Sequence, residues 1–195
     1  MTYFGPVQWY QKLYRNSPVL IEQHDSYQKQ TYRNRCVIAS PNGPQTLTVP
    51  VERAEGMRIS DHGNWRHLHW HALMTAYSES PFFEYYADDI RPFFEQRWDS
   101  LYDYDMAICR KMCELLDIRP DIRLTTEYVR DMTLVSPSSQ CTDMRDAIHP
   151  KHPLPDTDFT PRRYYQVFER KHGFLPNLSI LDLLFNMGPE SIFYL

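Results

Sequence analysis

The sequence predicts a single mixed α/β domain, of the α+β type, over residues 1–195. Three observations predict it. Two strand-like arms flank the turn signal at 41–44, segments with helical spacing of apolar residues follow them, and the chain length suits one hydrophobic core. We therefore expect a mixed sheet with an N-terminal βαβ-like unit and a β-hairpin, and helices packed on that sheet.

The β-hairpin is the clearest local feature of the chain. In its second arm, residues 45–52, Leu47, Val49 and Val51 alternate with other residues as in a half-buried strand. The first arm, residues 27–39, carries long polar side chains on both faces and becomes apolar only near its end. Because burying such side chains unpaired is costly, this arm either borders a wet pocket or is an exposed edge strand protected by charge.

The remaining elements follow from apolar periodicity and from Gly and Pro breaks. Two strands on either side of a short helix form the βαβ-like unit, and such strands are parallel. The last helix begins after a proline and ends at a Gly-Pro pair. We expect strands near residues 2–6, 18–24, 27–39, 45–52 and 122–129, and helices at 7–15, 65–77, 101–117 and 177–187.

The last predicted helix is apolar nearly all round, which indicates a buried helix. It carries one polar stripe, which includes Asp182 and Asn186. A carboxylate on a buried helix needs a partner, and the candidates are Arg33 and Arg35 of the first hairpin arm. The alternative is that the stripe simply faces water.

An ion pair between these elements would enclose a pocket. Guanidinium groups bind phosphate or carboxylate bidentately, and tyrosine packs against rings. The pocket would take a small anionic, hydroxyl-rich molecule, such as a sugar nucleotide. Its expected lining comprises Lys29, Tyr32, Arg33, Asn34 and Arg35, with Asp182 and Asn186 on the opposite side.

The densest histidine cluster comprises His62, His67, His69 and His71. Its spacing would suit a divalent metal on a strand or on a helix, with Asp61 as a further ligand, but no HExxH pattern is present. The alternative is a helix with His69 inward and the other histidines solvated. We expect no metal and no cofactor, and His67 or His71 is the candidate general base because imidazole titrates near neutrality.

Composition excludes some classes of function. The net charge of −4 argues against general nucleic-acid binding, which depends on basic patches. The chain has no apolar run near the roughly 20 residues of a membrane span and no secretory signal at its start. Four cysteines without a CxxC pair are expected to be free thiols, so we expect a cytoplasmic protein. The oligomeric state is not specified by the sequence.

Several blocks of the chain resemble the WbqC-like protein family. They are Tyr32-Arg33-Asn34-Arg35, the hairpin turn with residues 47–51, the region of Trp65, His67 and Tyr77, and the Ser-Ile-Leu-Asp-Leu-Leu-Phe-Asn pattern at 179–186. Asp25 takes the place of the acidic residue that closes the second strand in the family. Gly5-Pro6 stands where the family commonly carries Gln-Pro. The resemblance implies a bacterial protein of surface-glycan biosynthesis, such as lipopolysaccharide O-antigen, and adds Asp25, Trp65 and Tyr77 to the candidate substrate-binding residues.

No catalytic signature is complete, since GxSxG, P-loop and GxGxxG patterns are all missing. We expect an enzyme of surface-polysaccharide biosynthesis, a transferase that acts on a nucleotide-linked or lipid-linked sugar. Its candidate catalytic residues are His67, His71 and Asp182. One alternative is a non-catalytic binding or scaffold protein of a glycan pathway. A second alternative is a metal-dependent hydrolase at the histidine cluster.

Overall fold

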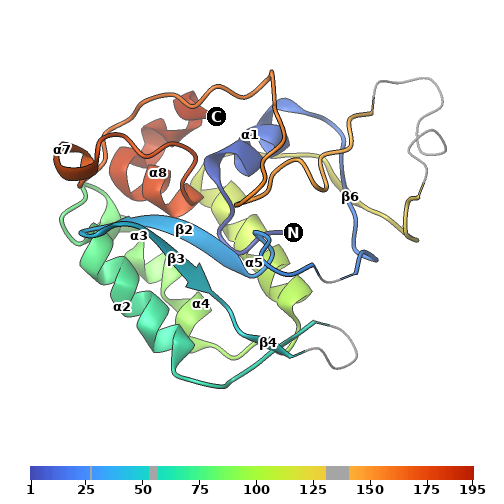
Figure 1. Cartoon of the computed structure of the whole chain (residues 1–195), viewed down its shortest axis with the longest axis horizontal. Coiled ribbons are helices and arrows are strands. Elements are labelled where there is room, and N and C mark those ends of the chain that lie inside the picture. Colours follow the sequence, from blue (N-terminus) through green and yellow to red (C-terminus); the bar gives the residue numbers. More distant parts are fainter. Residues whose placement is uncertain (27, 53–56, 131–140) are drawn as a thin grey trace.

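The computed structural model describes residues 1–26, 28–52, 57–130 and 141–195. Helices and short strands are mixed along the chain, which confirms the predicted α+β fold class (Figure 1). The helices are α1 (Val7–Arg15), α2 (Trp65–Tyr77), α3 (Phe83–Ile90), α4 (Pro92–Glu95), α5 (Leu101–Leu115), α7 (Glu169–His172), α8 (Ile180–Met187) and the 3-10 helix η1 (Gly188–Tyr194). The strands are β1 (Val19–Ile21), β2 (Arg35–Ser40), β3 (Gly43–Thr48), β4 (Val51–Glu52), β5 (Arg58–Ile59) and β6 (Ile122–Leu124).

The predicted hairpin is confirmed. β2 pairs antiparallel with β3, with Ser40 opposite Gly43 across a tight turn. Gly43 has a φ of +102°, which side chains with a Cβ rarely adopt. Cys36, Ile38 and Leu47 turn their side chains into the core. The hairpin runs between α2 and α8, and β2 contacts both helices (Figure 1).

The predicted single sheet is wrong. The described strands form three separate two-stranded sheets, β1–β6, β2–β3 and β4–β5. β1 is parallel to β6, and the segment 2–6 contributes one isolated bridge between Pro6 and Ser179, so the βαβ-like unit does not form. The backbone of Phe4 has a φ of +40°, so the segment cannot continue as an extended strand.

The predicted strands are also too long. β2 begins at Arg35 instead of near residue 27, which itself lies outside the described residues. The side chain of Asn34 turns inward and donates to the carbonyl of Val49, so the polar arm before β2 folds into turns. The second arm divides into β3 and β4 around Pro50, which has no N–H for a ladder. The predicted strands at 18–24 and 122–129 shorten to β1 and β6.

The four predicted helices are confirmed. The helices predicted at 7–15 and 65–77 match α1 and α2 at both ends, whereas α5 and α8 are each shorter at one end. Serine side chains cap the N-termini of two of these helices, α5 and α8. The Oγ of Ser100 accepts from the Asp103 N–H at 3.2 Å, and the Oγ of Ser179 accepts from the Leu181 N–H at 3.3 Å. The sequence did not predict α3, α4, α7 or η1.

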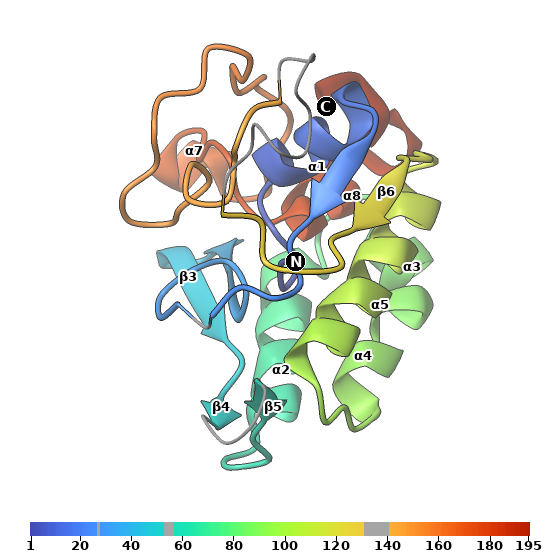
Figure 2. The same cartoon turned by 90° about the vertical axis from the view of Figure 1, so that its right-hand side faces the viewer.

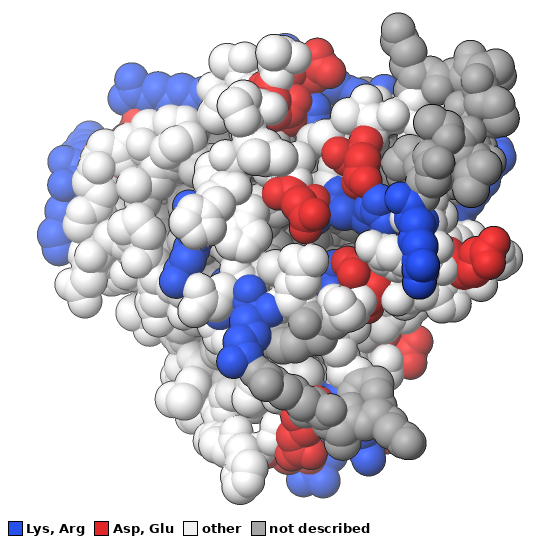
Figure 3. Space-filling model, turned by 45° about the vertical axis from the view of Figure 1, so that its right-hand side comes forward, with Lys and Arg blue, Asp and Glu red and all other residues white. Residues whose placement is uncertain are grey.

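The helices enclose a core rich in aromatic side chains. Tyr3, Phe4, Tyr10, Tyr77 and Tyr104 are fully buried. α2, α4 and α5 lie together with β4–β5 beside them, and α1 and α8 form the other part of the molecule (Figure 2). Acidic and basic side chains are intermixed on the face shown in Figure 3. In the described part of the chain, no helix has the length and apolar composition of a membrane span.

Candidate functional site

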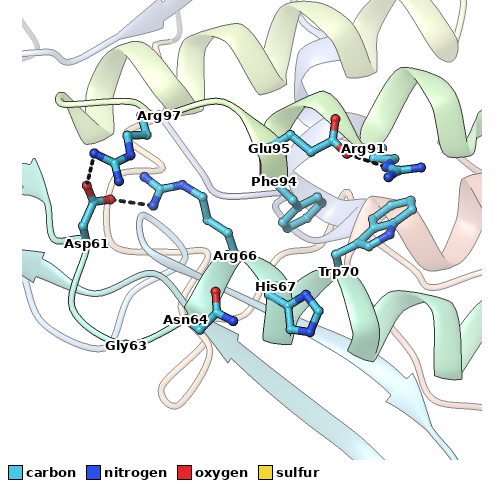
Figure 4. A pocket seen from close by; sticks show the side chains of 10 residues that line it. All are labelled: Asp61, Gly63, Asn64, Arg66, His67, Trp70, Arg91, Phe94, Glu95 and Arg97. Atoms are coloured by element: carbon cyan, nitrogen blue, oxygen red, sulfur yellow. Dashed lines mark hydrogen bonds and ion pairs between the residues drawn. The ribbon is translucent and has the colours of Figure 1, made fainter.

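A cleft of about 360 Å³ opens between the N-terminal part of α2 and the segment around α4 (Figure 4). We call it the α2–α4 cleft. Five of its residues lie on the helices α2 and α4, and the other five lie in the segments that flank these helices. It is lined by Asp61, Gly63, Asn64, Arg66, His67, Trp70, Arg91, Phe94, Glu95 and Arg97.

Arginine–carboxylate contacts lie at both ends of the cleft. At one end, Nη1 of Arg66 lies 2.6 Å from Oδ1 of Asp61, and Nη1 of Arg97 lies 3.6 Å from Oδ2 of the same carboxylate. The hydrogen bond from Arg66 holds the pKa of Asp61 below its usual range, so this carboxylate is ionised at neutral pH. At the other end, Nε of Arg91 donates to Glu95 at 2.6 Å.

Two aromatic side chains line the cleft near its Arg91–Glu95 end, the half-buried Trp70 and the buried Phe94. The rings of Trp70 and Phe94 are 5.8 Å apart at an interplanar angle of 38°, and Figure 4 shows them side by side next to the Arg91–Glu95 pair. Trp70 also stacks on Phe83, which fixes its orientation. The guanidinium of Arg66 lies 4.6 Å above the ring of Trp65. Charged groups and ring faces together can bind an anion that carries a ring.

The histidines of the predicted cluster do not gather at one site. His67 lines the cleft, and its ring contacts that of His71 at a centroid distance of 4.1 Å, with both side chains exposed. His69 lies on the opposite face of α2, 7 % exposed, with Nδ1 2.8 Å from the hydroxyl of Tyr3. Burial lowers the pKa of His69 to about 4. Within the described residues, no three His, Cys, Asp or Glu side chains are placed to hold a metal, so the ligand set of the metal-hydrolase alternative does not form.

Asp182 lies at the centre of a buried hydrogen-bond network. Its carboxylate is inaccessible to solvent and accepts from the hydroxyls of Tyr77 at 2.8 Å and Tyr164 at 2.7 Å, and from the amide of Gln166 at 2.9 Å. Burial raises the pKa of Asp182 from 3.8 to about 6, against the opposing effect of these three donors. The network joins α2 and the 164–166 segment to α8.

The predicted pairing of Asp182 with Arg33 or Arg35 is wrong, and so is the alternative of a solvated stripe. Arg33 forms an ion pair with Asp25, whereas Arg35 is half-buried with its Nε–H unpartnered among the described residues. Asn186 is buried and donates to the backbone carbonyl of Asp182 at 2.7 Å. Neutral donors satisfy the carboxylate, so the pocket expected between hairpin and helix does not form there.

Two predicted binding residues do meet elsewhere. Asp25 and Arg33 line a chamber of about 20 Å³, together with Tyr102 and Asp105. Asp105 is 2 % exposed, and burial raises the pKa of its carboxyl well above the usual range. A chamber of this size fits one water molecule and is too small for a sugar.

The other predicted binding residues do not line the α2–α4 cleft. Lys29 is exposed on a turn, and Tyr32 is half-buried. The side-chain N–H groups of Asn34 and Trp65 donate hydrogen bonds to backbone carbonyls, at 2.9 and 3.1 Å. Trp65 nevertheless supports the cleft, because Arg66 lies over its ring.

Sequence reasoning missed most of the cleft, including its three arginines and both aromatic residues. One signal was present within α2, where Arg66 and Trp70 are four residues apart and therefore share a helix face. The opposite wall comes from α4 and its flanking residues, about 25 positions further along the chain. Nothing in the local pattern indicates that these two segments face each other.

The chain is similar to known sequences. It matches the sequence model of the WbqC-like protein family over residues 2–152, a range that ends before α8. It is 27 % identical over 192 residues to "Uncharacterized protein Rv1507c" of Mycobacterium tuberculosis, covering 87 % of this chain and 83 % of that protein. No solved structure matches it significantly. The matched range is most of the chain and contains the whole α2–α4 cleft, and the protein therefore belongs to the WbqC-like protein family.

Proposed function

We propose that the α2–α4 cleft binds a phosphorylated sugar, in the first place a sugar nucleotide, of a bacterial surface-polysaccharide pathway. The observation that carries this proposal is that three arginines and two aromatic side chains line one cleft of about 360 Å³. Guanidinium pairs with phosphate bidentately, and aromatic faces pack on sugar and base rings. Pockets for small ligands begin at roughly 300 Å³.

The charge of the cleft also favours an anionic ligand. Its lining carries three arginines against two carboxylates, Asp61 and Glu95. The excess of one positive charge is neutralised by a phosphate group. The N-terminus of α2 adds partial positive charge at the same place, because Gly63 and Asn64 line the cleft directly before the helix.

As an enzyme, the protein would act as a transferase on this sugar, in the cytoplasm and without a nucleic-acid substrate. His67 is the proposed general base, since its exposed imidazole lies on the cleft wall and can take a proton from an acceptor hydroxyl. Asp182 is inaccessible to solvent, so we no longer propose it as a catalytic group. The link to glycans rests on the family resemblance, which is an association and not a mechanism.

Isothermal titration with uridine, guanosine and thymidine diphosphate sugars tests the proposal. Arg97→Ala is the informative variant, because this side chain is 84 % exposed and its loss leaves the core intact. We expect roughly 10-fold weaker binding of the preferred sugar nucleotide, as for one lost charge-assisted contact. Arg123→Ala is the matched control, since Arg123 is 61 % exposed and pairs with Asp121, outside the cleft.

The alternative of a non-catalytic scaffold protein predicts different results. If none of the sugar nucleotides binds, the proposed ligand site is overturned and the scaffold alternative is favoured. If one binds, mass spectrometry of the reaction with sugar acceptors tests for transfer. Loss of product with His67→Gln, at unchanged ligand affinity, supports the transferase, whereas binding without any product supports a binding protein.

A further inference from the structure

The two ends of the α2–α4 cleft differ in their balance of charge. At one end, the single carboxylate of Asp61 faces two guanidinium groups, those of Arg66 at 2.6 Å and Arg97 at 3.6 Å. At the other end, Arg91 and Glu95 form a one-to-one pair at 2.6 Å. Figure 4 shows Arg66 and Arg97 converging on Asp61, away from the Arg91–Glu95 pair. The excess positive charge of the cleft therefore lies at the Asp61 end.

The start of α2 strengthens this asymmetry. Asn64 is the N-cap residue, its side chain makes no capping hydrogen bond, and the first turn of α2 carries no acidic residue. α5 differs, because Ser100 caps its N-terminus and Asp103 lies in its first turn. The first backbone N–H groups of α2 are thus without a capping side chain at the end of the cleft where two arginines already meet.

Arg66 is held in position at this end by contacts that do not require a ligand. Its guanidinium lies 4.6 Å above the Trp65 ring, and its side chain is 15 % exposed. Asp61 and Arg97 are far more open, at 51 % and 84 %. A fixed arginine, an open arginine and an open carboxylate form an arrangement in which the carboxylate can leave and another anion can take its place.

We propose that the Asp61 end of the cleft is the phosphate subsite, and that Asp61 competes with the ligand's phosphate for Arg66 and Arg97. The inference rests on the proposed function and adds the orientation of the ligand. The phosphate lies at the start of α2, and the ring of the ligand lies over Trp70, which packs against the buried Phe94 at a centroid distance of 5.8 Å. Asp61 thereby lowers the affinity of the site for a phosphate group, so tight binding also requires contacts of the ligand outside the phosphate subsite.

Titration with inorganic pyrophosphate tests this role of Asp61 without any ring contacts. We expect Asp61→Asn to bind pyrophosphate about 5-fold more tightly than wild type, the gain from removing one exposed competing charge. The matched control is Glu95→Gln, which removes the carboxylate at the other end of the same cleft, and its affinity should stay within about 2-fold of wild type. Asp61→Ser should behave like Asp61→Asn, which excludes an effect specific to the new amide.

The outcomes separate this inference from the proposed function. Pyrophosphate binding that is unchanged or weaker in both Asp61 variants overturns the competition, while sugar-nucleotide binding by wild type still supports the cleft as the ligand site. A larger gain with Glu95→Gln than with Asp61→Asn would move the phosphate to the other end of the cleft. If neither pyrophosphate nor any sugar nucleotide binds to wild type or variants, both conclusions fail together.

Discussion

The hydroxyl of Tyr77 donates a 2.8 Å hydrogen bond to the carboxylate of Asp182 and so joins the end of α2 to α8. The same hydroxyl accepts from the backbone N–H of Ala39 in β2 at 3.2 Å. One phenol group thus connects the hairpin, the helix of the candidate site and the C-terminal helix. Because burial in low dielectric strengthens such bonds and makes their loss costly, the stability of the fold should depend on this network.

Tyr77→Phe tests the network directly. The substitution leaves a buried carboxylate and a buried backbone N–H each without one partner, so we expect a loss of roughly 2–3 kcal/mol in the free energy of unfolding. Urea denaturation measures it. Tyr85→Phe is the control, since Tyr85 is 74 % exposed and should change stability by less than about 0.5 kcal/mol. Equal stability of the two variants would show that the hydroxyl of Tyr77 contributes nothing.

Asp182 should make the protein less stable as the pH rises. Its pKa is 3.8 unfolded and about 6 in the folded state, so the folded protein binds the extra proton in this window. The contribution is fully present below about pH 3.8 and is lost as the pH rises through about 6. Between about pH 4 and pH 7 the loss is roughly 2–3 kcal/mol. Asp182→Asn should remove this contribution in urea titrations and so change the pH profile of stability, and an unchanged pH profile would contradict the assignment.

His69 should make the protein less stable as the pH falls. Its pKa falls from 6.5 to about 4 on folding, because burial disfavours the charged ring. The unfolded chain therefore binds more protons, and the stability present above about pH 6.5 is lost as the pH falls towards 4, by roughly 2–3 kcal/mol. His69→Gln should remove this contribution and leave the opposite pH dependence of Asp182, whereas the exposed His71→Gln should keep the wild-type profile.

In the wild-type protein these two effects overlap and largely compensate. The raised pKa of Asp182 and the lowered pKa of His69 cover nearly the same pH range with opposite signs. The double variant should therefore resemble wild type in its pH profile, although each single variant should not. A double variant with the profile of either single variant would show that one of the two groups does not titrate as assigned.

An Arg33 variant tests whether the ligand binds at the hairpin or in the α2–α4 cleft. Its ion pair with Asp25 lies outside the α2–α4 cleft, so Arg33→Ala should change sugar-nucleotide affinity by less than about 2-fold. The variant should still lose roughly 1–3 kcal/mol of stability, since both partners are mostly buried. Loss of ligand binding in this variant, with retention in Arg97→Ala, would place the ligand at the hairpin instead.

Gly188 should tolerate no side chain. It has a φ of +55°, and a Cβ there would lie 2.6 Å from the ring of Phe82. Gly188→Ala should therefore cost roughly 2–4 kcal/mol, from backbone strain together with overpacking. Gly43→Ala is the matched control, because its φ is also positive but, apart from its chain neighbours, no atom of the described residues lies within 4 Å of the added Cβ. Thermal unfolding should show the smaller loss, about 1 kcal/mol, for Gly43→Ala.

Local patterns in the sequence were enough for the elements whose cause is local. The helix at 65–77 matches α2 at both ends, since no Gly or Pro interrupts this segment and its residues are compatible with a helix. The tight turn before Gly43 specified the hairpin in the same way. The strand predicted at 2–6 and residues 28–34 of the strand predicted at 27–39 did not form, because Phe4 and Asn34 make distant contacts that no local pattern contains.

By itself, the sequence determined the fold class, the hairpin, the four main helices and the membership of the WbqC-like family. The tertiary structure alone decided which charges meet. Asp182 was recognised as a buried carboxylate in need of partners, but Tyr77, Tyr164 and Gln166 serve it rather than an arginine. The α2–α4 cleft could not be predicted from the sequence for the same physical reason. Side chains about 25 residues apart become neighbours through helix packing, and spacing along the chain does not encode that contact.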